Sequence, residues 1–507
     1  MEGYLQRILR ARVYEVAQET PLEPALRLSA RLGHQVLLKR EDLQPVFSFK
    51  LRGAFNLMAQ LPKQQLQRGV IAASAGNHAQ GVALAAQHLG CNAVIVMPIT
   101  TPRTKVDAVR SRGAEVVLHG DTFDEAQAHA RSLEQQRQLC FIHPFDDPEV
   151  IAGQGTIGLE ILRQCSEPPQ AIYLAVGGGG LISGVGAYVK SLWPSVQIIG
   201  VEPVDADAMT RSLAAGQRVR LEQVGLFADG VAVREVGEET FRLAQQVVDR
   251  MVTVDSDAIC AAIKDVFEDT RSILEPAGAL AVAGLKADAH NWPANSELVA
   301  VACGANMNFE RLRFVAERAA LGEEREAMFA VEIPEQPGSL KRFCLVLGTH
   351  NLTEFSYRRS GSGRAQIFVG VEISNRSDAQ RLKHDLEAGG FACVDLCGNE
   401  LAKLHLRHMV GGRLPDEARG SSDLQELLYR FEFPERPGAL MAFVDALHPG
   451  WSISIFHYRN QGSDVGRIVV GVQVPVAERD QWEQFLQQLP FPSWEETHNP
   501  AYRLFLA

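Results

Sequence analysis

The stretch Ser48-Phe49-Lys50-Leu51-Arg52-Gly53-Ala54-Phe55 contains a lysine between two large apolar residues, Phe49 and Leu51. Burial disfavours the charged ammonium form, so a lysine in such surroundings can have a lowered pKa. A neutral amine is a nucleophile towards carbonyl groups and can form a Schiff base. Many lysines in apolar company only keep their charged end in water, so this stretch alone leaves both interpretations open.

Short apolar segments alternate with helical patterns from Val70 onward. The pattern predicts strands over residues 70–73, 93–97, 115–118, 140–143, 172–176, 197–201 and 298–302. It predicts helices over 77–89, 104–112 and 182–190, and a helix capped by Asp121 that runs to about 136. Strands with helical spacers indicate right-handed βαβ units, and therefore an α/β fold of parallel sheets covered on both faces. Such folds bind ligands where a strand ends and the next helix begins.

The segment Ser74-Ala75-Gly76-Asn77-His78 follows one predicted strand and opens a helix. Gly76 permits close approach of the backbone, and the amides of a helix N-terminus suit an oxygen anion. Asn77 offers a donor and an acceptor in one plane. The alternative is an ordinary helix cap by Ser74 or Asn77.

The segment Gly177-Gly178-Gly179-Gly180-Leu181 stands at another strand-to-helix junction. Successive glycine amides can point into one concavity and bind an anion, although a flexible turn is the alternative. The segment lacks the Lys-Ser/Thr pair of a nucleotide loop and the spacing of a dinucleotide site, so a small phosphate monoester fits better. Cys303 ends the strand at 298–302, and we expect its thiol to be a hydrogen-bonding or buried group because no activating base is evident.

A Schiff-base lysine, a phosphate nest and a polar group at a strand end together suggest pyridoxal phosphate. Over about residues 4–314 the chain resembles the serine/threonine dehydratases of fold type II. The resemblance lies in KREDLQPVFSFKLRGA (39–54), SAGNHAQG (74–81), AGQGTIGLEI (152–161), GGGGL (177–181), GVEP (200–203), ADGVAV (228–233) and EPAGA (275–279).

The resemblance implies a role for each candidate site residue. Lys50 would bind the cofactor aldehyde and act as catalytic base, with Phe49 beside it, and Cys303 would contact the ring nitrogen. The substrate carboxylate and the ring hydroxyl would be held by Ser74, Gly76, Asn77 and His78, with Asn77 at the ring oxygen. The cofactor phosphate would lie on Gly177, Gly178, Gly179, Gly180 and Leu181. No metal site is expected.

The C-terminal part of the chain repeats itself. Residues 329–340 read FAVEIPEQPGSL and residues 429–440 read YRFEFPERPGAL, with the equivalent prolines at 334 and 434, an offset of 100. Each copy reads strand, Pro-Gly turn, helix, two strands and a second helix, which predicts a βαββαβ-type domain. We expect a catalytic domain over 1–320 and two stacked ACT-like domains, over 327–399 and 425–496, that share sheet edges.

Each copy also carries a strand with two aromatics and an arginine. An apolar slot beside free backbone amides could hold a branched-chain amino acid, whereas the alternative is that the aromatics are sheet core. The repeated positions are Phe355, Tyr357 and Arg358, and Phe456, Tyr458 and Arg459.

A dehydratase domain followed by two such domains resembles the biosynthetic threonine deaminases. The resemblance implies conversion of L-threonine to 2-oxobutanoate and ammonia in the first step of isoleucine synthesis, with L-serine as a secondary substrate. It also implies inhibition by isoleucine, opposed by valine, and a homotetramer. Cys303 departs from that group, in which serine is usual, and resembles serine dehydratases instead. A serine dehydratase or racemase on the same scaffold, or an amino-acid sensor without catalysis, are the alternatives.

Composition narrows the class of protein. The 507 residues require several domains, and 46% hydrophobic with 22% charged residues is ordinary for a globular protein. A net charge of −11 argues against a nucleic-acid surface. Residues 171–189 lack charge but contain four consecutive glycines, which argues against a membrane span. No signal peptide is evident and the eight cysteines are sparse, so we expect reduced thiols in the cytoplasm.

Overall fold

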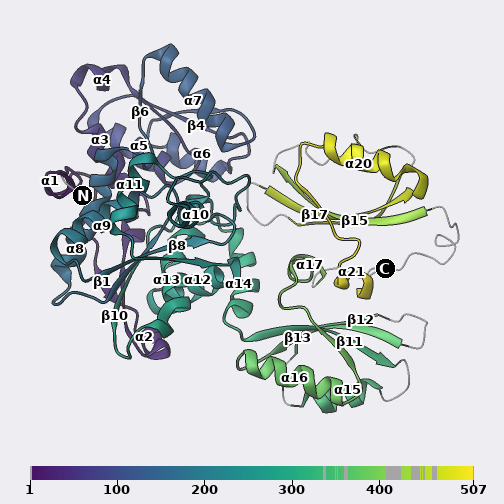
Figure 1. Ribbon diagram of the computed structural model, residues 1–507. Helices are drawn as coiled ribbons and strands as arrows, with labels where there is room; N and C mark the ends of the chain where they lie inside the picture. The colour runs from purple at the N-terminus through teal and green to yellow at the C-terminus, as the bar shows by residue number, and fades with distance from the viewer. Residues whose placement is uncertain are drawn as a thin grey trace. The chain divides into compact units, whose positions relative to one another are not determined.

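The computed structural model describes residues 3–334, 339–348, 350, 352–358, 364–406, 424–434, 446, 448, 451–459 and 465–505. The chain divides into two compact units, Met1–Ala319 and Ala320–Ala507. Figure 1 shows the first unit from purple to teal and the second from green to yellow.

The first unit contains two sheets of mainly parallel strands. The smaller has the order β5-β4-β3-β6, with strands Glu115–Leu118, Ala93–Met97, Val70–Ala73 and Cys140–Phe141. The larger has the order β1-β2-β10-β7-β8-β9, and only β1 is antiparallel to its neighbour. Its strands are Leu22–Pro24, Gln35–Lys39, Glu297–Val301, Ala171–Ala175, Gln197–Pro203 and Arg250–Val254.

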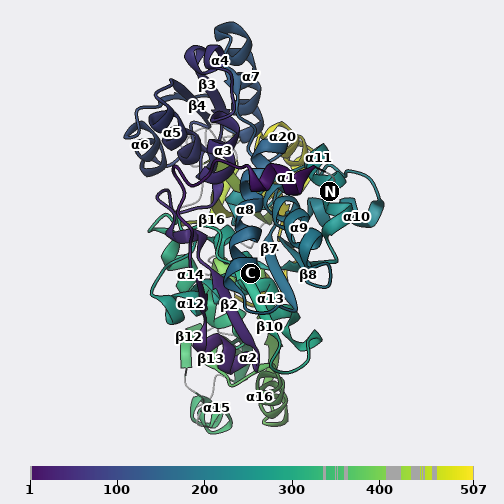
Figure 2. The same ribbon diagram turned by 90° about the vertical axis from the view of Figure 1, so that its left-hand side faces the viewer.

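Helices surround both sheets, as Figures 1 and 2 show for α5 and α7 at the smaller sheet and α9 and α13 at the larger. In chain order, α1 to α7 span Tyr4–Leu9, Leu26–Leu32, Lys50–Met58, Lys63–Arg68, Asn77–Leu89, Arg103–Arg110 and Phe123–Arg137. Then α8 to α14 span Pro148–Gln164, Gly180–Leu192, Ala208–Ala215, Glu238–Val247, Ser256–Thr270, Pro276–Asp288 and Arg311–Gly322. Single 3-10 turns lie at η1 Glu41–Leu43, η2 Asp229–Val231 and η3 Ala289–Asn291.

The smaller sheet is covered on both faces, as the continuous apolar strands predict. Alternate residues of one strand enter different clusters: Val70 and Ala72 pack with α5, whereas Ile71 and Ala73 pack with α7. All four residues are buried. The predicted α/β architecture of parallel βαβ units is therefore confirmed.

One predicted helix cap is wrong. The cap of α7 is Thr122 and not Asp121, because the Thr122 hydroxyl accepts from the amide of Glu125 while the Glu125 carboxylate accepts from the Thr122 amide. This reciprocal capping box satisfies two free amides at once, which a lone aspartate cannot do. The predicted strand at 140–143 is also shorter, since β6 ends at Phe141.

The second unit contains two antiparallel sheets of four strands, ordered β12-β13-β11-β14 and β16-β17-β15-β18. The first copy spans β11 Glu326–Pro334, α15 Ser339–Leu347, β12 Leu352–Arg358, β13 Arg364–Glu372, α16 Arg376–Ala388 and β14 Ala392–Asp395, followed by α17 Glu400–Leu404. This order confirms the predicted βαββαβ arrangement for that copy. The second spans β15 Leu424–Pro434, β16 Ser452–Arg459, β17 Val465–Pro475, η5 Val476–Glu478, α20 Arg479–Gln488, β18 Ser493–Glu495 and α21 Pro500–Phe505. Both Pro-Gly turns, at 337–338 and 437–438, lie outside the described residues.

The two copies do not share sheet edges as predicted, since the described strands form two separate sheets. They meet instead through the sheet faces: Met328 and Phe368 of one sheet lie in an apolar cluster with Leu428 and Val469 of the other. β11 is apolar on both sides, so Phe329 enters its own domain core while Met328 enters the shared cluster.

Within the described residues, no helix is long and apolar enough to cross a membrane. The uncharged segment 171–189 is occupied by the strand β7, the glycine loop and most of α9.

Candidate active site

Lys50 is the first residue of α3 and is partly buried. Its Nζ donates a hydrogen bond to the backbone oxygen of Pro144 at 3.0 Å and lies 5.4 Å from the centre of the Phe49 ring. Burial lowers the pKa of Lys50 to about 8, although the nearby Cys303 acts in the opposite direction. A substantial fraction of this amine is therefore neutral near pH 8, which is the form that attacks carbonyl groups.

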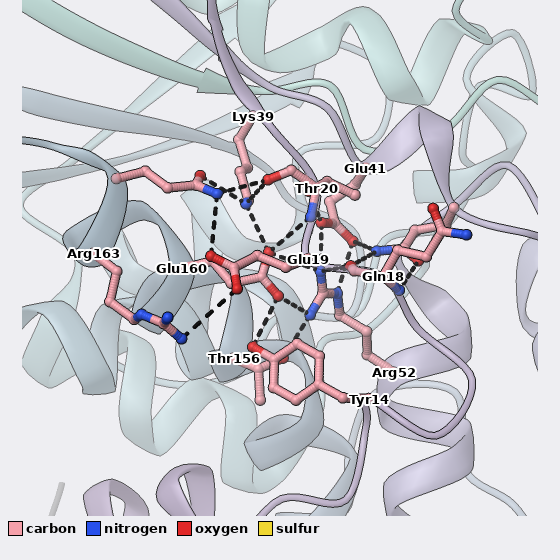
Figure 3. A network of polar contacts seen from close by, with 12 residues as sticks. Tyr14, Gln18, Glu19, Thr20, Lys39, Glu41, Arg52, Thr156, Glu160 and Arg163 are labelled. Carbon is pink, nitrogen blue, oxygen red and sulfur yellow. Dashed lines mark hydrogen bonds and ion pairs between the residues drawn. The ribbon is translucent and has the colours of Figure 1, made fainter.

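Arg52, two residues further along the same helix, is buried in a network of charged side chains that Figure 3 shows. Its guanidinium contacts Glu41 at 2.8 Å and Glu160 at 2.6 Å, and Lys39 contacts Glu160 at 2.6 Å. Burial alone would lower the pKa of Arg52, but the two carboxylates outweigh it and raise that pKa. Two cations and two carboxylates balance, and the network fixes the helix that carries Lys50.

The glycine segment lies between the end of β7 and the start of α9. Gly179 has a φ of 95°, a conformation that favours glycine. The Ser183 amide donates to the Gly179 carbonyl at 3.0 Å, so the first turn of α9 begins there. Amides of a first turn have no acceptor within the helix and are available to an anion.

These glycines are also required by packing. A β-carbon on Gly178 would lie 2.2 Å from the Phe145 ring, and one on Gly179 would lie 2.7 Å from Met209 Cε. The donor set fits a phosphate monoester, since it consists of the backbone amides of a glycine-rich segment at a helix start. Ser48 Oγ, two residues before Lys50, is buried without a hydrogen-bond partner among the described residues, as a polar atom awaiting a bound group would be.

Asn77 is the first residue of α5, and no side chain caps this helix. Its Nδ2 donates to Glu275 Oε1 at 2.5 Å, and its Oδ1 accepts from Asn306 Nδ2 at 2.6 Å. Gly76 precedes it, and a β-carbon on Gly76 would meet no atom within 4 Å. Space is therefore open beside Gly76, the residue that precedes this helix. The alternative that Ser74 or Asn77 caps α5 is wrong, because the cap position is Gly76.

His78 is buried, and its Nε2 lies 2.9 Å from the backbone oxygen of Ile142. Burial and the neighbouring Lys50 lower the pKa of His78 to about 3, so the ring is neutral. One ring nitrogen is occupied by this backbone contact. The substrate-binding role of His78 stays a prediction.

Cys303 lies just after β10, and its Sγ donates to the backbone oxygen of Ala277 at 3.4 Å. Burial and Glu275 raise the pKa of this thiol, so it is neutral and a poor nucleophile. The Phe49 amide donates to the Cys303 carbonyl at 3.3 Å, which joins the thiol's segment to the loop that carries Lys50. The roles of Phe49, Leu181 and Ser74 likewise stay predictions.

Two polar residues at this site, Glu275 and Asn306, were not assigned a role from the sequence. Burial and the Asp229 carboxylate raise the pKa of Glu275 to about 7. Asp229 itself contacts Lys105 at 2.7 Å and Arg311 at 3.3 Å, and these cations lower its pKa against the effect of burial. The only sequence signal was the position of Glu275 and Asn306 at segment ends within recognisable motifs.

The repeated strands of the second unit can be followed along the backbone. Phe355 pairs with Val369 and Phe456 with Val470, so the two strands occupy equivalent positions in their sheets. The side chains of Phe355, Tyr357, Arg358, Phe456, Tyr458 and Arg459 lie outside what the structure describes. Their effector role stays a prediction. Among the described residues no group of three or more histidine, cysteine and acidic side chains could hold a metal ion.

A lysine of lowered pKa and a glycine-rich strand-to-helix junction, on two sheets of mainly parallel strands, are typical of a pyridoxal-phosphate enzyme of fold type II. Comparison with known proteins agrees. Residues 13–304 match the family described as pyridoxal-phosphate dependent enzyme, and residues 317–406 and 417–506 match the C-terminal regulatory domain of threonine dehydratase.

Similar proteins cover the whole chain. It is 58% identical to the biosynthetic L-threonine dehydratase of Burkholderia multivorans, over 99% of both chains, and 51% identical to that of Escherichia coli, over 99% of this chain and 97% of the relative. The solved structure of processed threonine deaminase isoform 2 from Solanum lycopersicum matches with a TM-score of 0.62 and 56% identity, over 63% of this chain and 88% of that one. Maize serine racemase matches with a TM-score of 0.58 and 31% identity, over 62% and 96% of the two chains.

The chain belongs to the biosynthetic threonine dehydratase family. It is a lyase that depends on pyridoxal phosphate, and its C-terminal unit is a regulatory domain pair. The alternatives, a serine dehydratase or racemase on the same scaffold or an amino-acid sensor without catalysis, are not favoured.

Proposed function

We propose that Lys50 binds pyridoxal phosphate covalently and that this site converts L-threonine to 2-oxobutanoate and ammonia. The observation that carries the assignment is the lowered pKa of Lys50, about 8, in a position where its Nζ donates to a backbone carbonyl and lies over the Phe49 ring. The relatives named above as threonine dehydratases support the choice of substrate.

The bound cofactor supplies an electron-withdrawing ring that stabilises negative charge at the substrate α-carbon. Residues of the chain transfer the proton and hold the cofactor. The neutral Lys50 amine takes the α-proton as general base. The amides from Gly177 to Leu181 would hold the phosphate at the start of α9, and the neutral Cys303 thiol would contact the ring nitrogen.

The start of α5 binds the substrate in this proposal. A β-carbon on Gly76 would meet no atom within 4 Å, so the space beside this glycine is open at the N-terminus of α5, where backbone amides suit a carboxylate. Asn77 would contact the ring oxygen, and the neutral His78, held by its contact with the Ile142 backbone oxygen, would help to hold the substrate at the same helix start. If the glycine segment holds the cofactor phosphate, that phosphate would be a group able to supply the proton that the departing β-hydroxyl needs.

A second substrate, L-serine, is favoured by one observation. Cys303 stands where serine is usual in threonine deaminases and so resembles the serine dehydratases. A thiol is larger and a weaker hydrogen-bond donor than a hydroxyl, and this alters the contact with the ring more than the substrate pocket. We therefore propose threonine as the main substrate and serine as the secondary one.

The regulatory unit binds isoleucine as inhibitor, and valine opposes it, in our proposal. The matched family description, a regulatory domain of threonine dehydratase, supports regulation of this kind. Domains over 1–320, 327–399 and 425–496, a homotetramer and a cytoplasmic location complete the proposal. The seven described cysteines are free thiols, which fits a reducing compartment.

The test is a steady-state assay of the full-length chain with threonine and with serine, each across an isoleucine titration. We expect a higher kcat/KM for threonine and inhibition by isoleucine that valine relieves. A higher kcat/KM for serine would contradict the substrate assignment. Inhibition by isoleucine that survives in Arg358→Ala/Arg459→Ala would contradict the effector residues.

A further inference from the structure

We infer that Asn306 and Glu275 are positioning residues that hold the Asn77 carboxamide so that its free N–H faces the oxygen of the cofactor ring. The inference rests on the proposed function, because it takes Asn77 as the partner of that ring oxygen. Neither residue needs to touch the cofactor. Both act through the orientation of one side chain.

The orientation of the Asn306 side chain is set by a backbone carbonyl. Asn306 Nδ2 donates to the oxygen of Val46 at 2.8 Å. A carbonyl oxygen only accepts hydrogen bonds, so the amide nitrogen of Asn306, and not its oxygen, must lie here. The same nitrogen donates to Asn77 Oδ1 at 2.6 Å. The oxygen end of Asn77 is therefore fixed on the side of Asn306.

The opposite end of Asn77 is held by a carboxyl group. Asn77 Nδ2 donates one hydrogen to Glu275 Oε1 at 2.5 Å. An amide nitrogen carries two hydrogens, so a second N–H is left for a ligand. An N–H donated to an oxygen anion is a charge-assisted bond, stronger than a neutral one. A reversed amide would present its own oxygen to that anion and repel it.

We call this chain of hydrogen bonds, from the Val46 carbonyl through Asn306 and Asn77 to Glu275, the relay. It joins four segments that are distant in the sequence: the loop before α3, the segment after β10, the start of α5 and the residue before α13. Gly304 leaves room for the contact between two of them. A β-carbon on Gly304 would lie 2.1 Å from Glu275 Oε1 and 3.2 Å from Asn77 Nδ2. Any larger residue there would push the carboxyl group away from Asn77.

The charged residues around Glu275 do not change the direction of its hydrogen bond with Asn77. Asp229 of η2, Lys105 of α6 and Arg311 of α14 act on it, and its pKa is about 7. A carboxyl group has an acceptor oxygen whether it is ionised or protonated, so Asn77 keeps its partner on both sides of pH 7. A glutamine at 275 would also offer an acceptor oxygen, which makes Glu275→Gln the conservative variant.

The test uses the full-length protein and measures pyridoxal phosphate directly. The variants are Asn306→Ala, Asn77→Ala, the double variant, Glu275→Leu and Glu275→Gln. The readouts are the dissociation constant of pyridoxal phosphate and the ratio of visible to near-ultraviolet absorbance of the bound cofactor at fixed pH. The visible band reports the anionic ring oxygen. Circular dichroism and the thermal midpoint check that each variant folds.

We expect Asn306→Ala and Glu275→Leu to weaken cofactor binding by about tenfold, the scale of one oriented hydrogen bond, and to lower the absorbance ratio. Glu275→Gln should keep both values close to wild type. In the Asn77→Ala background, Asn306→Ala should change neither, because the side chain through which it acts is gone.

Two results would overturn the inference. One is an Asn306→Ala effect of the same size with and without Asn77, which would make Asn306 a general support of the loop. The other is an unchanged absorbance ratio in both Asn306→Ala and Glu275→Leu. Failure of the proposed function would look different: the wild-type protein itself would show no visible band and no cofactor fixed to Lys50 by borohydride.

Discussion

Lys50 and Arg52 are two cations of the same helix, two residues apart, in opposite electrostatic surroundings. Arg52 is fully buried between Glu41 and Glu160, and its pKa is raised. Lys50 donates to one backbone carbonyl, and its pKa falls to about 8. Residues two apart point to nearly opposite sides of an α-helix, so α3 has one anchored side and one reactive side.

The difference shows that burial alone does not decide the charge of a basic group. Burial disfavours both cations, and only the one with carboxylate partners keeps a high pKa. Lys39 shows the limit of this rule: it contacts Glu160, yet burial outweighs the carboxylate and still lowers its pKa. The carboxylates Glu41 and Glu160 pair with Arg52 and Lys39, whereas the Lys50 amine donates to a backbone carbonyl.

The largest expected effect comes from removing the reactive cation. Lys50→Ala should lower turnover of threonine by about a thousandfold or more, because the base and the covalent attachment are lost together. Steady-state kinetics at saturating pyridoxal phosphate measures the loss. The exposed Lys63 is the matched control, and Lys63→Ala should leave turnover unchanged. Equal turnover in Lys50→Ala and wild type would end the assignment.

Breaking the anchored side should affect stability. Glu160→Gln leaves Arg52 and Lys39 with one carboxylate between them, which should cost about 3–5 kcal/mol of unfolding free energy. The control is Glu115→Gln, which breaks the exposed pair with Arg137 at 2.9 Å and should cost at most about 1 kcal/mol. Urea denaturation of both variants makes the comparison. Similar losses in the two would show that the buried network is not an anchor.

The lowered pKa of Lys50 also predicts that the stability of the protein without cofactor depends on pH. Between pH about 8 and the ordinary lysine pKa of 10.5, the unfolded chain holds a proton on Lys50 that the folded chain has released. Stability contributed by this site therefore rises with pH through that window. The unfolding free energy of wild type minus that of Lys50→Met should therefore become more positive as pH rises from 8 to 10.5. If the same quantity became more negative over this range, the pKa of Lys50 would be raised in the folded protein and not lowered.

A smaller effect is expected at the substrate side of the site. Gly76→Ala should raise the KM for threonine by about fivefold, the scale of one weakened hydrogen bond, because the added methyl enters the open space beside the helix amides. Thermal stability should change little. Gly153→Ala is the opposite case, since its β-carbon would lie 2.7 Å from the Arg52 carbonyl, and it should destabilise the fold. An unchanged KM in Gly76→Ala would place the carboxylate elsewhere.

The smallest effect should come from Cys303→Ser. A hydroxyl keeps a neutral hydrogen-bonding group near the ring nitrogen, so most activity with threonine should remain. The ratio of kcat/KM for threonine to that for serine measures any change in preference. Loss of activity as complete as in Lys50→Ala would require a covalent role for the thiol.

Features that depend on neighbouring residues, such as helix bounds, were predicted best from the sequence. The helix Asn77–Leu89 was predicted to the residue because Gly90, with a φ of 65°, ends it. The cap of α7 was missed because Asp121 and Thr122 can both cap, and the reciprocal bond of Glu125 decides between them. Lys50 is indicated by its apolar neighbours Phe49 and Leu51, whereas Asn77 and Cys303 are indicated by their positions after predicted strands, and all three roles stay predictions.

Long-range contacts were not predictable in the same way. Asn77 meets Glu275 and Asn306 across 198 and 229 residues of sequence, and no local pattern records such a meeting. The sheet faces of the second unit were mistaken for edges because the repeat shows which strands exist and not which side of β11 is covered. Apolar residues on both sides of β11 were the signal that could have corrected this.

The most direct test of the account is the identity of the lysine that holds the cofactor. Full-length protein saturated with pyridoxal phosphate would be reduced with borohydride, digested and mapped by mass spectrometry. The account predicts one phosphopyridoxyl peptide, modified at Lys50. Modification at Lys39, Lys105 or any lysine other than Lys50 would contradict the distinction between the reactive and the anchored side of α3.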